Sequence, residues 1–157
     1  MANTFLENDT FRKVVDSIPL VSIDLVIRNP EGQILLGKRV NRPAQGDWFV
    51  PGGRILKNES VDVAFERLVL NELNIQVQFK SASYVGLYDH FYPDSIWGEA
   101  VSTHYLVNAF EIKVDRILSL PDQQHNDYRW FSVEELLSSS EVHEHTKWYF
   151  TEGKGYS

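Results

Sequence analysis

The 157-residue sequence contains no cysteine, which excludes disulfide bonds, thiolate metal sites and a cysteine nucleophile. It has no apolar run near the roughly 18 residues of a membrane span, and its start lacks the basic, apolar and small-residue succession of a secretory signal. Basic residues are few, because 15 lysines and arginines face 22 acidic residues, a formal charge of −7. We therefore expect a cytoplasmic protein without a membrane or nucleic-acid partner, since phosphate backbones bind basic surfaces.

The length and composition favour one domain over residues 1–157, which is large enough to form a hydrophobic core without disulfides or structural metals. Acidity does not exclude a small anionic ligand, because a metal ion and a few arginines invert the local field.

Apolar periodicity and turn residues predict the order of helices and strands. Helices are expected at about 11–18, 60–73 and 133–138, with further helix around 143–150. Asn8 and Asp9 are the candidate caps of the first helix, and Pro19 closes it. Strands are expected at 20–27, 33–38, 48–50, 82–88, 103–114 and 128–131. Strands around one central helix favour an α+β fold, or an α/β/α sandwich, over a doubly wound sheet.

The chemistry concentrates in one fixed spacing. Gly53 is followed after five residues by Glu59, after seven more by Arg67, and Glu72 lies five further on. Glycines let a backbone approach a ligand closely and leave a carbonyl for a metal, while helical carboxylates suit a hard cation. Glu59 and Arg67 are expected to form a structural pair that braces the loop and helix.

This spacing resembles the Nudix box, Gly-x5-Glu-x7-Arg-Glu-x-x-Glu-Glu-x-Gly. The approach at 46–53 and the segment 128–136 resemble Nudix domains as well, so the likeness covers nearly the whole chain. It implies the Nudix fold, an α/β/α sandwich with a mixed β-sheet and a loop-helix-loop motif.

Departures from the box are informative. Leu68 and Asn71 stand where the family has carboxylates on one helix face, and only Glu72 remains. A single carboxylate does not hold two or three divalent ions, so we expect one Mg²⁺ per subunit that relies on substrate phosphates. Asn74 replaces the final glycine and tolerates a left-handed helix end. The alternative interpretation is a binding module that has lost catalysis.

A polar loop at 121–130 offers replacements for the lost groups. His125 is suited to act as a base, because the ordinary pKa of histidine, roughly 6.5, lies near neutrality. Gln124 is a candidate oxygen ligand for the metal. The alternative for His125 is a solvated surface residue.

Long collinear stretches are similar to one Nudix branch, the GDP-mannose mannosyl hydrolases. They are 19–24, 35–39, 41–46, 48–54, 64–68, 90–92, 103–105 and the loop around His125. The likeness implies substitution at the anomeric carbon of the sugar, with GDP as the leaving group, rather than attack at phosphorus. It also implies a homodimer, with the N-terminal helix and first strand at the interface.

The resemblance carries site roles onto matching positions. The implied metal ligands are Gln124, Glu72 and the carbonyl of Gly52 or Gly53. His125 is implied to deprotonate the attacking water. The implied substrate-binding and catalytic side chains are Arg39, Arg54 and Tyr105 for the diphosphate, and Asp24 and His90 for the sugar.

Other interpretations stay open. Asp24 in an apolar strand indicates either a functional residue or a buried ion pair. Tyr105 and His90 are alternatively core residues that only pack. Arg39 and Arg54 are alternatively surface cations. His104, His143 and His145 receive no role. The alternative functions are a conventional Nudix diphosphatase cleaving P–O and a non-catalytic nucleotide-sugar sensor. The residues do not distinguish mannose from glucose as the sugar, and the expectation of guanine as the base rests on the family resemblance alone.

Overall fold

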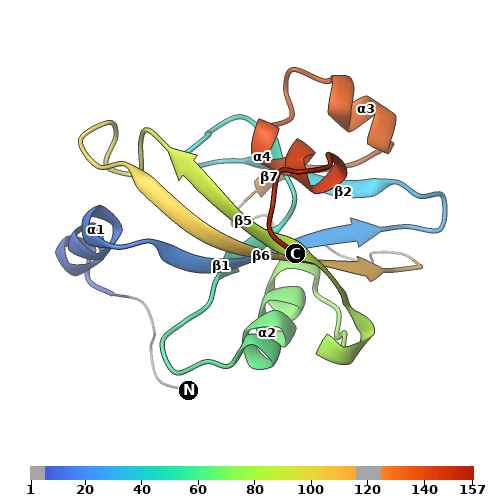
Figure 1. The fold of residues 1–157 in the computed structure, drawn as a ribbon, viewed down its shortest axis with the longest axis horizontal. Helices are drawn as coiled ribbons and strands as arrows, with labels where there is room; N and C mark the ends of the chain where they lie inside the picture. The colour runs from blue at the N-terminus through green and yellow to red at the C-terminus, as the bar shows by residue number, and fades with distance from the viewer. Residues whose placement is uncertain (1–5, 116–124) are drawn as a thin grey trace.

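The computed structural model describes residues 6–115 and 125–157, and Figure 1 shows its fold. The helical elements are α1 (Asn8–Ser17), α2 (Val61–Leu73), η1 (Phe79–Ser81), α3 (Val133–Ser138), α4 (Glu144–Lys147) and η2 (Trp148–Phe150). The strands are β1 (Leu20–Arg28), β2 (Ile34–Arg39), β3 (Trp48–Phe49), β4 (Gly52–Arg54), β5 (Ser83–Tyr92), β6 (Thr103–Lys113) and β7 (His125–Phe131). Among these described residues, no helix is long and apolar enough to cross a membrane.

The sheet is mixed and forks at β1. Its main path runs β3-β2-β1-β6-β5, with β1 parallel to β6 and antiparallel to β2. At one end β1 pairs with β2 through Arg28 and Ile34, whereas at the other end β4 takes this place, with Asp24 opposite Gly52. β7 extends the sheet on the far side of β2. The fork separates β1 from the end of β2 and leaves space between them.

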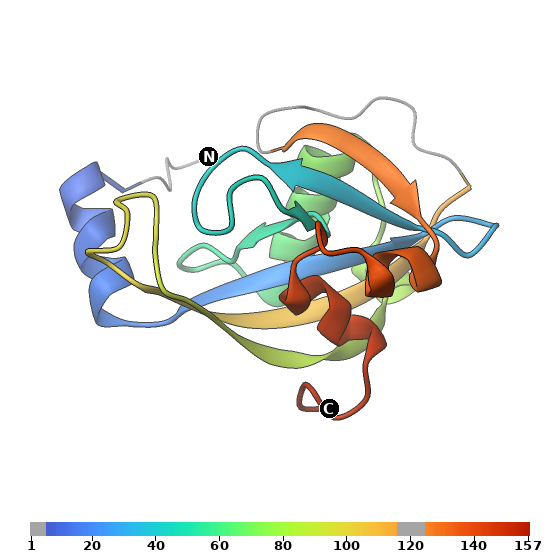
Figure 2. The ribbon, with the colours of Figure 1, turned by 90° about the horizontal axis from the view of Figure 1, so that it is seen from above.

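Helices cover both faces of the sheet, as Figures 1 and 2 show. On one face, α2 packs against alternate side chains of β1, including Ile23, Leu25 and Ile27. On the other face, the C-terminal helices bury Leu136 and Tyr149 against Val26 and its neighbours. The strands are apolar on both faces of the sheet. Each face therefore packs against its own layer of helices, which gives the three-layer arrangement. The expected α+β fold, an α/β/α sandwich with a mixed sheet, is confirmed.

Three local expectations differ from the structure. Glu7 precedes α1 without a side-chain cap, and Asn8 and Asp9 lie inside the helix, so the predicted caps are wrong. Gly52–Arg54 forms a strand that was not predicted from the sequence, because glycines have low strand propensity and the strand forms by pairing with β1. β5 continues to Tyr92, beyond its expected end at residue 88. The left-handed Asn74 at the end of α2 is confirmed, with φ of 57°.

Candidate active site

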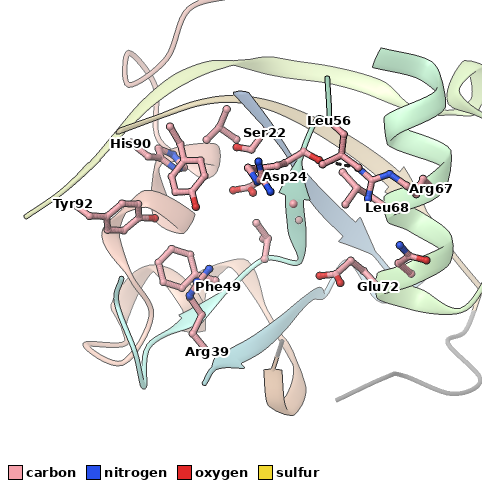
Figure 3. Close-up of a pocket in the computed structure, with 17 residues that line it drawn as sticks. Ser22, Asp24, Arg39, Phe49, Leu56, Arg67, Leu68, Glu72, His90 and Tyr92 are labelled. Atoms are coloured by element: carbon pink, nitrogen blue, oxygen red, sulfur yellow. Dashed lines mark hydrogen bonds between the residues drawn. The ribbon is translucent and has the colours of Figure 1, made fainter. Parts of the chain in front are cut away.

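The fork opens a cavity of about 410 Å³ between β1, β2, β4, α2, β5 and β6. Figure 3 shows side chains entering from opposite walls, with His90 and Tyr92 on one side and Leu68 and Glu72 on the other. Eight of the ten site residues expected from the sequence line this cavity. They are Asp24, Arg39, Gly52, Gly53, Arg54, Glu72, His90 and Tyr105.

The two glycines are required by close packing. A Cβ atom on Gly52 would collide with the carbonyl oxygen of Ile23 and the carboxylate of Asp24. A Cβ atom on Gly53 would lie 2.5 Å from Cδ2 of Leu68. The absence of side chains therefore lets β4 enter the fork and brings its backbone to the cavity.

The α2 wall carries one carboxylate. Leu68 is buried beneath Gly53, and Asn71 and Glu72 line the cavity. Burial raises the pKa of Glu72 from its ordinary 4.5 to about 7. A backbone hydrogen bond from Gly52 and the Arg39 guanidinium oppose this rise, while Asp24 adds to it. Glu72 therefore lies where an added positive charge would favour its ionised form.

The expected brace between Arg67 and Glu59 is confirmed. Nε of Arg67 donates to Oε2 of Glu59 at 2.6 Å, and its Nη2 donates to the Arg54 carbonyl at 2.8 Å. Glu59 also accepts from the backbone N–H of Leu56 at 2.9 Å. Arg67 lines the cavity but is committed to holding the loop before α2 in place.

The opposite wall carries a polar chain centred on Asp24. The hydroxyl of Tyr149 donates to Oδ2 of Asp24, and the hydroxyl oxygen of Tyr149 lies 3.4 Å from Nε2 of His90. Because the single phenol proton goes to Asp24, His90 donates to Tyr149 from Nε2. Burial raises the pKa of Asp24 to about 7, which the Tyr149 hydrogen bond and Arg39 oppose.

Histidines extend this wall into the protein. His145 stacks on His90 with ring centroids 4.2 Å apart, and His143 lies 4.5 Å from His145. Burial lowers the pKa of His90 to about 2 and that of His145 to about 3, so both rings are neutral. Nδ1 of His145 is buried and has no hydrogen-bond partner among the described residues. The sequence analysis gave His143 and His145 no role and missed Tyr149. Tyr149 lies 125 residues from Asp24 in the chain, so no local sequence pattern links the two side chains.

Two arginines and a tyrosine form the third side of the cavity. Cζ of Arg54 lies 4.6 Å from the Phe11 ring centroid, and Cζ of Arg39 lies 5.6 Å from that of Phe49. Both cations act on half-buried Tyr105, whose pKa is raised by desolvation and lowered in part by the two guanidiniums. Forked guanidinium donors suit a diphosphate.

Two expected residues are placed only in part. His125 begins β7, and its backbone pairs with Arg39 at the end of β2, which carries it to the edge of the cavity. Its side chain and the whole of Gln124 lie outside the described residues. Their expected roles stay predictions.

The donor chemistry fits a hard divalent cation with few protein ligands. Glu72 offers a half-buried carboxylate, and the backbone of Gly52 and Gly53 lines the cavity without side chains. Within residues 6–115 and the described part of the C-terminal region, no three histidines or carboxylates converge as a metal cluster. An ion here would therefore complete its shell with substrate oxygens and water.

Known proteins share this architecture. The family model described as NUDIX domain matches residues 19–151. The low-salt glycan biosynthesis protein Agl8 of Haloferax volcanii is 42% identical over 128 residues, which are 82% of this chain and 80% of that protein.

Among solved structures, the MutT protein of Methanosarcina mazei Go1 has a TM-score of 0.69 at 23% identity, covering 85% of this chain and 92% of the other. The NUDIX domain of Shewanella oneidensis NrtR, complexed with ADP ribose, has a TM-score of 0.65 at 15% identity, covering 92% and 96%. These low identities support the fold, while the domain match and Agl8 establish the family. The chain belongs to the Nudix hydrolase family, whose members generally use divalent metal ions.

Proposed function

We propose that this protein hydrolyses a GDP-sugar, GDP-mannose or also GDP-glucose, to GDP and the free sugar. The reaction is Mg²⁺-dependent, and water attacks the anomeric carbon. The carrying observation is the contrast across the cavity, where α2 presents Leu68 and Asn71 in place of carboxylates while Asp24 enters from β1. A wall with one carboxylate is poorly built for aiming water at phosphorus.

The diphosphate would lie along Arg39, Arg54 and Tyr105, which line one side of the cavity. These donors stabilise the charge that grows on GDP as the glycosidic C–O bond breaks. Glu72 and a Gly52 or Gly53 carbonyl, with Gln124 as the predicted third ligand, would hold a divalent ion, which would add neutralisation of the leaving group. A stable anionic leaving group needs no general acid.

Asp24 would face the sugar. Positive charge on the anomeric carbon and ring oxygen is stabilised by a nearby carboxylate, as in glycoside hydrolysis. Tyr149 holds one carboxylate oxygen of Asp24, and neutral His90 holds Tyr149. We assign His90 to the sugar side of the site, directly or through this chain.

The attacking water would be deprotonated by His125, which β7 brings to the end of β2 beside Arg39. One displacement by one water inverts the anomeric centre, so an α-linked GDP-mannose should release β-mannose first.

Two relatives support a nucleotide-sugar substrate. Agl8 is named for glycan biosynthesis, and the NrtR domain is complexed with ADP ribose, in which a diphosphate joins a sugar to a nucleoside. The guanine base and the mannose rest on the resemblance to the GDP-mannose mannosyl hydrolases. A single domain over 1–157, a homodimer and a cytoplasmic location belong to the same proposal.

Hydrolysis in ¹⁸O-water tests the bond. Attack at carbon places the label in the free sugar and leaves GDP unlabelled, which is the result we expect from a panel of GDP-, ADP- and UDP-sugars. Label in a phosphate, together with GMP or a sugar phosphate, would establish the conventional diphosphatase instead. Binding of a nucleotide sugar without turnover would establish a sensor.

A further inference from the structure

His145 lies in the short helix α4, behind the wall that carries Asp24. The residue is buried, and its ring is nearly parallel to that of His90, with an interplanar angle of 14°. The described lining of the active-site cavity includes His90 but not His145. Any influence of His145 on a bound substrate must therefore pass through other residues.

The hydrogen bond to Tyr149 holds the His90 ring only weakly. Nε2 of His90 lies 3.4 Å from the Tyr149 hydroxyl oxygen, beyond the roughly 2.7–3.2 Å that is usual for a bond from N–H to oxygen. The orientation of the ring must therefore be set largely by packing. Tyr88, Trp148 and Tyr149 contact this ring at interplanar angles of 50°, 67° and 39°, whereas His145 lies flat against it.

His145 is itself held from several sides. Its backbone N–H donates to Nδ1 of His143 at 3.0 Å, which fixes the start of α4. Its ring packs against Trp148 and Tyr92, with centroids 4.5 and 4.8 Å apart. Its own Nδ1 has no hydrogen-bond partner among the described residues, and an unpaired buried nitrogen costs stability. The contact that this side chain offers to His90 is therefore the flat face of its ring.

The charge state of His90 agrees with this geometry. Burial lowers the pKa of His90 to about 2, and the neighbouring rings of His145 and His143 contribute to the shift. A neutral His90 keeps one ring proton, which must lie on Nε2 for donation to Tyr149. A protonated His90 would instead place positive charge on the wall where the anomeric carbon becomes positive, and would oppose that charge.

We propose that His145 is a positioning residue, which holds the His90 ring in the orientation that directs its Nε2–H at Tyr149 and thereby steadies Asp24. Each link is a contact in the structure, because His145 stacks on His90, His90 donates to Tyr149, and Tyr149 donates to Asp24. The inference rests on the proposed attack at the anomeric carbon and extends it to a residue that touches no substrate.

A double-mutant cycle in steady-state kinetics tests this connection. His145→Asn removes the ring and should lower kcat about three- to tenfold, while KM for GDP-mannose stays near its wild-type value. Because His145 acts through Tyr149, the double variant His145→Asn/Tyr149→Phe should be no slower than Tyr149→Phe alone. Losses that multiply in the double variant would show that the two residues act independently, which would overturn the inference.

Two further variants separate positioning from general destabilisation. His145→Phe keeps a flat ring and should restore most of the kcat that His145→Asn loses. His104→Asn is the matched control, because His104 also stacks on an aromatic ring, that of Phe91 at 27°, but lines no part of the active-site cavity. Its kcat should equal that of wild type. A loss in His104→Asn as large as that in His145→Asn would contradict a specific role.

NMR of the ¹⁵N-labelled histidine rings in the substrate-free protein gives a readout that does not depend on activity. Near neutral pH, His90 of wild type should carry its proton on Nε2 alone, whereas His145→Asn should show a mixture of both tautomers. An unchanged His90 tautomer in His145→Asn would overturn the inference whatever bond the enzyme breaks. If the ¹⁸O experiment excluded attack at carbon while the His90 tautomer still depended on His145, the positioning role would stand and the proposed reaction would fall.

Discussion

The two walls of the active-site cavity carry different kinds of side chain. The α2 wall carries the Nudix spacing but faces the ligand with Leu68, Asn71 and a single carboxylate, Glu72. The opposite wall lies outside that spacing, yet it joins Asp24 to Tyr149 and His90 in one polar chain. In this protein the Nudix motif holds the loop and helix in position, through its glycines and the Arg67 brace. Many of the polar side chains of the cavity lie on the wall opposite the motif.

The largest expected effect comes from neither wall but from β7, the strand that pairs with β2. His125→Gln should lower kcat by roughly 10²–10⁴, the usual range for loss of a general base, with little change in substrate binding. Steady-state kinetics across pH 5–9 measures both. The variant should also lose the acidic limb of the pH–rate profile. Near-full activity would move the base to another residue, with Asp127 tested first.

A smaller but still large effect is expected on the α2 wall. Glu72→Gln should raise the Mg²⁺ concentration for half-maximal activity by at least about tenfold, the lower bound for loss of a partner that only supports a metal ligand. Glu66→Gln is the control, because Glu66 lies on the same helix but accepts from the backbone N–H of Phe79 at 3.0 Å instead of lining the cavity. Identical magnesium titrations for all three proteins would contradict the metal assignment.

On the opposite wall we expect a change of about tenfold. Tyr149→Phe removes the hydroxyl that donates to Asp24 and accepts from His90, and loss of the bond to Asp24 alone is worth roughly 1.5 kcal/mol, the lower figure for a bond to a charged group. If Asp24 acts mainly in the transition state, kcat should fall while KM stays near its wild-type value. Tyr156→Phe, which removes the exposed hydroxyl that donates to half-buried Asp89 at 3.3 Å, is the matched control. Equal kinetics in both variants would show that Tyr149 does not position Asp24.

The remaining prediction concerns stability and its pH dependence rather than the rate of the reaction. The pKa of His145 is lowered by burial to about 3 in the folded protein, so below about pH 6.5 the unfolded chain binds a proton that the folded chain does not. Stability from this group is complete above pH 6.5 and is lost as pH falls, at up to about 1.4 kcal/mol per pH unit.

His145→Asn should therefore flatten the loss of stability between pH 6 and 4, measured by urea unfolding without metal. Measurement at pH 8, where the wild-type histidine is neutral in both states, isolates any change in packing. The raised pKa values of Asp24 and Glu72 act with the opposite sign, because their stability is lost as pH rises through about 7. Parallel curves for wild type and variant would contradict the histidine assignment.

The sequence predicted what depends on local pattern. The apolar run of β1, the amphipathic α2 and the left-handed Asn74 are each readable from adjacent residues, and the structure agrees with all three. The Nudix spacing and the branch likeness located residues that meet in one cavity although they are distant in the chain.

What remained hidden depends on tertiary contact. Tyr149 becomes informative only when the C-terminal helices fold over the sheet and place its hydroxyl on Asp24. His145 lies in a short helix of unremarkable composition and gains meaning only by stacking on His90. The strand pairing of Gly52 and Gly53 likewise depends on the fork in β1, which no local propensity encodes.

The end-on packing of α1 has a consequence for how this enzyme could change over time. Its contacts run mainly through a small core around Val15, separate from the two cores on the faces of the sheet. Most substitutions in the helix should therefore leave the two sheet cores unchanged, whereas Phe11 contacts Arg54 of the active-site cavity, with its ring centroid 4.6 Å from Cζ. The fold should thus tolerate variation along α1 at positions other than Phe11, whose replacement would change the surroundings of Arg54.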